Sequence, residues 1–243
     1  QPPAPTTEID GTDLIFRTNG AFSGLGEGET EDVVVRISAT DDKGETTFGT
    51  VTITVTGSDH APEITSSAAA ALGSVTETGA EAAGALVASG RLLASDADVR
   101  GQLVGAWAIE PVASNTTALG VMNIDAQTGL WTYTLNDVAA NRLAQGDVFT
   151  ETFTATITDA TGRTDTEQVS VTINGANDVP TMQVATATIT EGTAQAVFDL
   201  STLASDPDTG DGLSFSVLDT ELPAGSFTLN GSVLSFETNG DFA

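Results

Sequence analysis

The sequence predicts an all-β protein made of antiparallel β-sandwiches, with about seven strands in each unit and the units arranged end to end. Apolar residues alternate with threonine along several segments, for example residues 51–55 and 153–158. Such period-two alternation, rich in β-branched and aromatic residues, indicates half-buried strands. Glycine-containing turns separate these segments and favour tight connections between strands; examples are Asp10-Gly11, Asn19-Gly20 and Asn230-Gly231.

The chain repeats itself, and the repeats divide it into units. Residues 44–62 align with residues 162–180, and residues 3–22 align with residues 223–242. Because self-similarity at such a distance indicates tandem structural units, we expect three units, of which only the middle one is whole. The expected boundaries are the C-terminal part of a unit at 1–58, a linker at 59–62, a complete unit at 63–176, a linker at 177–180 and the N-terminal part of a further unit at 181–243.

The positions of the strands follow from the alternation within each unit. In the first unit, the pattern predicts a strand over residues 51–55. In the complete unit, it predicts strands over residues 131–135, 153–157 and 169–173. Residues 137–144 favour a short helical turn instead.

The composition excludes several classes of function. The chain holds 34 Asp and Glu against 7 Lys and Arg, for a net charge of −27. Nucleic acid and anionic membrane surfaces are therefore not expected partners, because both need a basic patch. Without an apolar run of about 18 residues, no insertion into a membrane is expected. With no cysteine, disulfides and thiolate metal sites are excluded. The acid excess favours either solubility in a salty or extracellular medium or the binding of hard cations.

Four segments resemble a known family: residues 129–136, 143–147, 153–159 and 171–180 are similar to a VCBS-type repeat. These repeats are cadherin-like modules that occur in tandem in giant adhesins of Gram-negative bacteria, often of the RTX kind. The resemblance covers most of the middle unit, and the flanking units resemble the superfamily less tightly. It implies tandem cadherin- or immunoglobulin-like sandwiches, an extracellular place on the bacterial surface, arrays stiffened by Ca²⁺ and a role in biofilm attachment. We also expect the chain to be a segment of a longer protein, since no signal peptide opens it.

Acidic residues recur beside both linkers. Two Asp-x-Asp loops, at residues 95–98 and 205–208, follow the two linkers at matching distances. Strand order in such a sandwich brings loops of one end together, and Ca²⁺ takes six to eight oxygen ligands. We therefore predict Ca²⁺ sites at the two linkers. The first would use Asp59, Asp96, Asp98 and Asp159, and the second Glu77, Asn177, Asp178, Asp206 and Asp208.

The first linker departs from the second at one position, where His60 stands in the place of Asp178. Histidine is a poor ligand for Ca²⁺, so the first linker would bind the ion more weakly or use Asp59 instead. A different interpretation applies to every single aspartate in a turn, because such side chains commonly accept hydrogen bonds from nearby backbone N–H groups.

These observations predict a non-catalytic extender segment of a large bacterial adhesin, which projects a distal binding domain for attachment. No catalytic motif supports an enzyme. The alternative is a carbohydrate- or protein-binding β-sandwich module, which requires aromatic residues exposed at one end. We expect Trp107, Trp131 and Tyr133 to be core or cross-strand residues instead.

The expected partners are neighbouring repeats of the same protein. Incomplete sandwiches expose strand edges and apolar faces, so residues 181–243 of one molecule could be completed by residues 23–58 of another. That head-to-tail association would bring Asp41, the counterpart of Asp159, against Asp206 and Asp208. The other interpretation is that the boundaries only reflect where the chain was cut.

Overall fold

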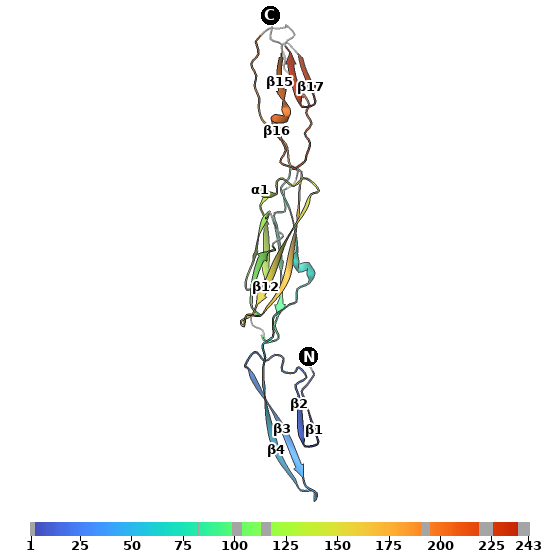
Figure 1. Cartoon of the computed structure of the whole chain (residues 1–243), viewed down its shortest axis with the longest axis vertical. Coiled ribbons are helices and arrows are strands. Elements are labelled where there is room, and N and C mark those ends of the chain that lie inside the picture. Colours follow the sequence, from blue (N-terminus) through green and yellow to red (C-terminus); the bar gives the residue numbers. More distant parts are fainter. Residues whose placement is uncertain are drawn as a thin grey trace.

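The protein is described by a computed structural model that covers residues 3–81, 83–98, 104–112, 118–190, 195–218 and 226–237. Figure 1 shows an elongated molecule in which three groups of strands follow one another along the long axis. Helical structure in the described residues is limited to α1 (Asp137–Ala140) and two short 3-10 turns. The expected all-β architecture of sandwiches arranged end to end is therefore confirmed.

The middle group of strands is a two-layered sandwich. One sheet has the order β6 (Leu72–Thr76), β13 (Thr164–Asn174), β12 (Val148–Thr158), β9 (Ala106–Pro111). The other has the order β10 (Gly120–Ile124), β11 (Leu130–Leu135), β7 (Val87–Arg91). Before β6, the chain forms β5 (Glu63–Ile64), which pairs with β8 (Ala94–Ser95), and the 3-10 turn η1 (Ala68–Ala71).

One pairing differs from the antiparallel arrangement that the sequence predicts. Strand β6 runs parallel to β13, with Val75 opposite Ile173. The chain enters this sandwich at one end and leaves at the other (Figure 1). Its first and last strands therefore point the same way, and their pairing must be parallel.

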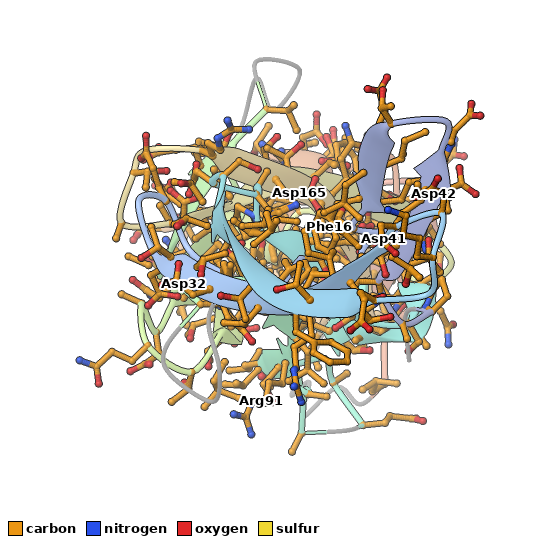
Figure 2. All side chains as sticks on the ribbon, turned by 90° about the horizontal axis from the view of Figure 1, so that it is seen from below. Phe16, Asp32, Asp41, Asp42, Arg91 and Asp165 are labelled. Carbon is orange, nitrogen blue, oxygen red and sulfur yellow. The ribbon has the colours of Figure 1, made fainter. Side chains whose placement is uncertain are left out.

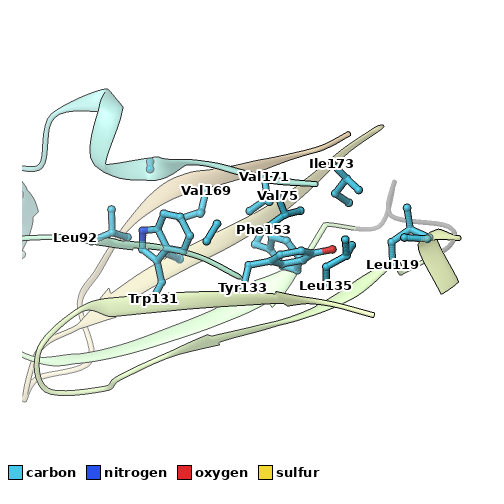
Figure 3. Packing of buried hydrophobic residues seen from close by; sticks show 14 of the residues in the cluster. Val75, Leu92, Leu119, Trp131, Tyr133, Leu135, Phe153, Val169, Val171 and Ile173 are labelled. Atoms are coloured by element: carbon cyan, nitrogen blue, oxygen red, sulfur yellow. The ribbon is translucent and has the colours of Figure 1, made fainter. Parts of the chain in front are cut away.

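The core of the middle sandwich lies between the two sheets, and Figure 3 shows its central residues. Trp131 and Tyr133 from β11 pack against Val171 and Ile173 from β13, and all four side chains are fully buried. The indole N–H of Trp131 donates to the carbonyl of Ala70 over 2.8 Å. This interior explains why the middle group is the best-packed part of the chain.

Two glycines allow the Trp131 ring to lie against the backbone. A Cβ atom at Gly90 would stand 2.5 Å from Trp131 Cζ2, and one at Gly73 would stand 2.9 Å from Trp131 Cη2. Real Cβ atoms do not approach other atoms so closely. The absence of side chains on β6 and β7 at these positions is thus a condition for burying the largest core residue.

A buried carboxylate lies at the other end of this core. Glu151 is 3% exposed. Its two oxygens accept hydrogen bonds from the Leu119 N–H and the Tyr133 hydroxyl. Burial, together with the neighbouring Glu151 charge, raises the pKa of Tyr133. Both carboxylate oxygens are satisfied, so this group is a structural element of the core.

The first group of strands consists of two hairpins. Strands β1 (Thr6–Asp10) and β2 (Asp13–Arg17) form one, and β3 (Thr30–Thr40) and β4 (Thr46–Thr56) form the other. The β3–β4 hairpin has the same strand lengths as β12–β13. The apolar residues of β4, which are Val51, Ile53 and Val55, are only half-buried. The aligned residues of β13, which are Val169, Val171 and Ile173, are fully buried.

The third group repeats the smaller sheet of the middle sandwich. Strands β15 (Gln195–Asp199), β18 (Val233–Glu237) and β17 (Ser226–Asn230) pair in the order β15-β18-β17, which matches β7-β11-β10. Strand β14 (Thr181–Met182) pairs with β16 (Ala204–Ser205) as β5 pairs with β8, and η2 spans Leu200–Thr202. Residues 219–225 and 238–243, within the predicted third unit, lie outside the described residues.

No helix in the described part of the chain is long and apolar enough to span a membrane.

Replacing Trp131 by alanine is expected to lower the free energy of unfolding by about 3–5 kcal/mol, because the buried ring leaves a cavity. Phe48 is 71% exposed, so Phe48→Ala is the matched control and should change stability by less than about 0.5 kcal/mol. Denaturant unfolding followed by circular dichroism measures both. Equal effects of the two substitutions would contradict the described core.

Candidate metal sites at the two joints

Acidic side chains gather at the two ends of the middle sandwich, where it meets its neighbours. We call these places joint 1 and joint 2. Joint 1 contains the first-linker residues Asp59 and His60, the loop after β8 with Asp96 and Asp98, and Asp159 in the β12–β13 turn. Joint 2 contains Glu77 after β6, Asp137 of α1, the second-linker residues Asn177 and Asp178, and the loop after β16 with Asp206 and Asp208.

The two Asp-x-Asp loops have the same local structure. In each, the first aspartate accepts a hydrogen bond from the backbone N–H of the second, over 3.0 Å in both Asp96–Asp98 and Asp206–Asp208. Each loop follows a two-residue strand that pairs with the strand after the linker. The backbone N–H of the linker residue then donates to the second aspartate, from His60 over 2.6 Å and from Asp178 over 3.0 Å. These bonds tie each linker to the unit that follows it.

At joint 2, three carboxylates each keep one oxygen without a partner. Glu77 is 1% exposed, and its Oε1 accepts the Ala176 N–H over 3.0 Å while its Oε2 has no partner. Asp208 is 3% exposed, and its Oδ1 is likewise unpartnered. Asp178 Oδ2 is the third such atom. Burying an ionised carboxylate oxygen without a hydrogen-bond donor destabilises the folded state, so positive charge at joint 2 would stabilise it.

The pKa values of two of these carboxyl groups are raised, which also shows that the ionised forms are disfavoured at joint 2. Burial raises the pKa of Glu77 to about 7; the Ala176 hydrogen bond acts in the opposite direction, and the charges of Asp178, Asp208 and Asp137 add to the rise. Burial also raises the pKa of Asp178, assisted by Asp208, Asp137 and Asp206. A bound cation would offset both causes, because its charge favours the ionised carboxylates.

Asp137 is a member of joint 2 that the sequence did not reveal. Its Oδ1 accepts the Thr78 N–H over 2.8 Å, and its charge acts on both Glu77 and Asp178. Asp137 lies outside the segments whose similarity defines the repeat, so the repeat gave no signal at this position. Strand order could have placed Asp137 here, because the loop after β11 returns to the end of the sandwich where β6 terminates.

At joint 1, Asp159 forms a tight turn and keeps one oxygen unpartnered. Its Oδ1 accepts the N–H groups of Thr161 and Arg163, each over 2.9 Å, whereas Oδ2 is buried without a partner. Desolvation alone would raise the pKa of Asp159, but these hydrogen bonds outweigh it and lower the pKa. A cavity of about 560 Å³ opens beside it and is lined by Asp59, Asp96 and Asp98.

The other acids of joint 1 already have protein partners. Asp59 forms an ion pair with Arg163 and accepts the Thr161 hydroxyl over 2.8 Å. Asp98 contacts His60 twice, through the backbone N–H and through the ring Nδ1 over 2.7 Å. Arg163 and Thr161 are residues that the sequence analysis missed, because it placed the β12–β13 turn at the first linker through Asp159 but considered only acidic side chains there.

Asp41 is not brought together with the other predicted residues. It lies in the β3–β4 turn, at the lower end of the molecule in Figure 1 and labelled in Figure 2. Its Oδ1 accepts the N–H groups of Lys43 and Glu45, each over 2.9 Å. This repeats the Asp159 turn, so the two aspartates are structural counterparts in the corresponding hairpin turns of two successive groups of strands.

Among the described residues, no group of three or more His, Cys, Asp or Glu side chains is placed so as to hold a metal ion. The carboxylates of each joint therefore lie near one another without converging on one point. Metal binding at either joint would require their side chains to rotate inward.

Comparison with known proteins bears on the middle sandwich. Residues 60–175 match the family model of the bacterial cadherin-like domain. No curated protein is significantly similar to the chain.

Among solved structures, the chain is similar to PcdhgB3 EC1-4, with 17% identity and a TM-score of 0.48, over 96% of this chain and 55% of that one. It is also similar to mouse cadherin-23 EC22-24, with 16% identity and a TM-score of 0.47, over 93% of this chain and 68% of that one. The human desmocollin-1 ectodomain gives 16% identity and a TM-score of 0.41, over 98% of this chain and 44% of that one. The chain thus spans about half the length of the first of these structures.

The match over residues 60–175, on a sandwich with seven strands in its two main sheets, identifies the middle unit of this chain as a cadherin-like repeat.

Proposed function

We propose that this chain is a non-catalytic, calcium-stiffened extender segment of a large bacterial surface adhesin, in the manner of VCBS repeats in RTX and biofilm proteins. It would hold a distal binding domain away from the cell, outside the membrane. The bacterial cadherin-like match and the end-to-end sandwiches (Figure 1) support this role, since modules of this type typically act in adhesion or as extenders.

The observation that carries the proposal is the position of the unpartnered oxygens. Within the described residues, the buried side-chain polar atoms without a partner are four carboxylate oxygens, all in residues that the sequence nominated as Ca²⁺ ligands: Glu77 Oε2, Asp159 Oδ2, Asp178 Oδ2 and Asp208 Oδ1. Carboxylate oxygen is the donor that Ca²⁺ prefers. The chemistry of both joints therefore fits the ion, whose charge would offset the burial of these groups.

At joint 2, the candidate ligands come from three parts of the chain. Glu77 and Asp137 belong to the middle unit, Asp178 to the linker, and Asp206 and Asp208 to the third unit. When bound, Ca²⁺ supplies positive charge that all three parts share. The residues themselves already hold the linker through the Asp178 N–H to Asp208 bond. The joint would then resist bending, and an array whose units contact only their neighbours would become a rod.

The alternative function, a carbohydrate-binding module, has less support. Trp131 and Tyr133 are fully buried and Trp107 is 7% exposed, so these rings cannot stack on a sugar. No described feature favours a particular protein ligand or a catalytic reaction.

Neighbouring repeats are the partners that we propose, including a second copy of this chain. The sheet β15-β18-β17 lines an apolar hollow of about 230 Å³ with residues that include Phe198, Phe227 and Phe236. In the middle sandwich, the equivalent sheet is covered by β12–β13, and β3–β4 is a hairpin of the same kind with a half-buried apolar face. A β3–β4 hairpin from a second copy would cover the hollow head to tail.

Calcium at 1 mM is expected to raise the unfolding midpoint relative to chelator by roughly 5–10 °C. The substitutions Asp206→Asn and Asp208→Asn together should remove most of this rise, because they take two carboxylates from joint 2. The control pair Asp10→Asn and Asp13→Asn lies in the exposed β1–β2 turn and should keep it. Differential scanning calorimetry measures the midpoints, and a calcium-independent midpoint would refute metal-locked joints.

The response to Glu77→Gln should change sign with Ca²⁺. The pKa of Glu77 in the folded state, about 7, exceeds the ordinary value of 4.5. In chelator, the free energy of unfolding of the wild type therefore falls as the pH rises from 4.5 to 7, because Glu77 ionises in the unfolded state before it ionises in the folded state. At pH 8 the variant should therefore be more stable by about 1–3 kcal/mol. With Ca²⁺ it should be less stable, because it lacks a ligand. Urea unfolding at pH 5 and pH 8, with and without Ca²⁺, tests both signs.

Self-association through the apolar hollow should depend on Phe198. Sedimentation velocity over micromolar to millimolar concentration should reveal oligomers of the wild type that Phe198→Asp weakens. Val138 is 88% exposed on the middle unit, so Val138→Asp should leave association unchanged. A wild-type monomer at every concentration would exclude the second copy as the occupant.

A further inference from the structure

We infer that the two joints are not equivalent metal sites: the imidazole of His60 occupies, at joint 1, the position beside Asp98 that a Ca²⁺ ion would take beside Asp208 at joint 2. This inference rests on the proposed Ca²⁺ binding and specifies which joint depends on the ion. It predicts that joint 2 is locked by metal, whereas joint 1 is partly locked by the protein's own N–H donors.

The argument compares two carboxylates in the same local structure. Asp98 and Asp208 each donate their N–H to the first aspartate of their loop. Each also accepts the linker N–H through Oδ2. The two carboxylates differ at the remaining oxygen. Asp98 Oδ1 lies 2.7 Å from His60 Nδ1, whereas Asp208 Oδ1 is buried without a partner.

The contact at His60 does not depend on the charge of the ring. An ionised carboxylate can only accept, so Nδ1 must carry the hydrogen whether the imidazole is neutral or protonated. At joint 2 the aligned residue is Asp178, which has no N–H donor in its side chain and instead adds a second unpartnered oxygen. At joint 1 an imidazole N–H donor therefore lies against the second aspartate of the loop, whereas at joint 2 two buried acceptor oxygens have no donor.

A second contact strengthens the difference. The linker residue Asp59, aligned with Asn177, forms an ion pair with Arg163 and accepts the Thr161 hydroxyl. The Asp59 side chain is only 14% exposed, and the Arg163 guanidinium already supplies positive charge beside it. The buried oxygen of joint 1 that has no partner is Asp159 Oδ2, beside the cavity of about 560 Å³. Joint 1 thus keeps a candidate position at Asp159 and loses the one at His60.

Reciprocal substitutions in the full chain test the inference, with calcium chloride as the titrant in isothermal titration calorimetry. His60→Asp should add at least one bound Ca²⁺ ion per chain or strengthen binding by about tenfold or more. Asp178→His should have the opposite effect. His60→Asn is the matched control, because its amide keeps an N–H donor toward Asp98 without adding a carboxylate, and it should leave the titration unchanged.

Each outcome has a separate meaning. If the wild type binds Ca²⁺ but His60→Asp gains nothing, the two joints are alike and the inference is overturned while the proposed function stands. If His60→Asn gains Ca²⁺ as His60→Asp does, the ring's bulk rather than its donor was decisive, which also overturns it. If the wild type and all variants bind no Ca²⁺ while circular dichroism shows them folded, the proposed function itself fails.

Discussion

Negative charge buried at the ends of the middle sandwich is the constraint on which the rest of the structure depends. The chain carries far more acid than base, and folding places part of that acid where water is excluded. Burial, and after it the charges of neighbouring carboxylates, raises the pKa values of Glu77 and Asp178. A compensating positive partner at such an end of the sandwich would stabilise the folded state.

The chain offers two kinds of compensation. At joint 1 the protein supplies its own donors, through Arg163 against Asp59 and His60 against Asp98. At joint 2 the described residues supply only backbone N–H groups, from Ala176 to Glu77 and from Asp178 to Asp208. Amide groups orient these carboxylates but do not neutralise them, and so joint 2 is where an external cation would have the larger mechanical effect.

The packed core of the middle sandwich holds the strand ends that carry the residues of the joints. Trp131, packed over glycines of β6 and β7 (Figure 3), fixes the two sheets against each other. The end of β6, whose Glu77 N–H donates to the Asn174 carbonyl at the end of β13, then holds Glu77 in place. The half-buried apolar faces of β3–β4 and β15-β18-β17 show the contrasting case, in which the same strand pairs lack an opposing layer.

The sequence alone determined the strands, the repeat and the acids that recur beside each linker, because alternation, turn residues and self-similarity are local signals. It also singled out the four residues whose buried oxygens lack partners. Only the tertiary structure decided which further side chains meet these acids. Asp137 joined Glu77, and Arg163 joined Asp59, because the ends of non-adjacent strands lie together, while Asp41 stayed apart at the far turn. Parallel pairing of β6 with β13 was decided in the same way, since a strand pattern records burial but not the neighbour to which the strand is hydrogen-bonded.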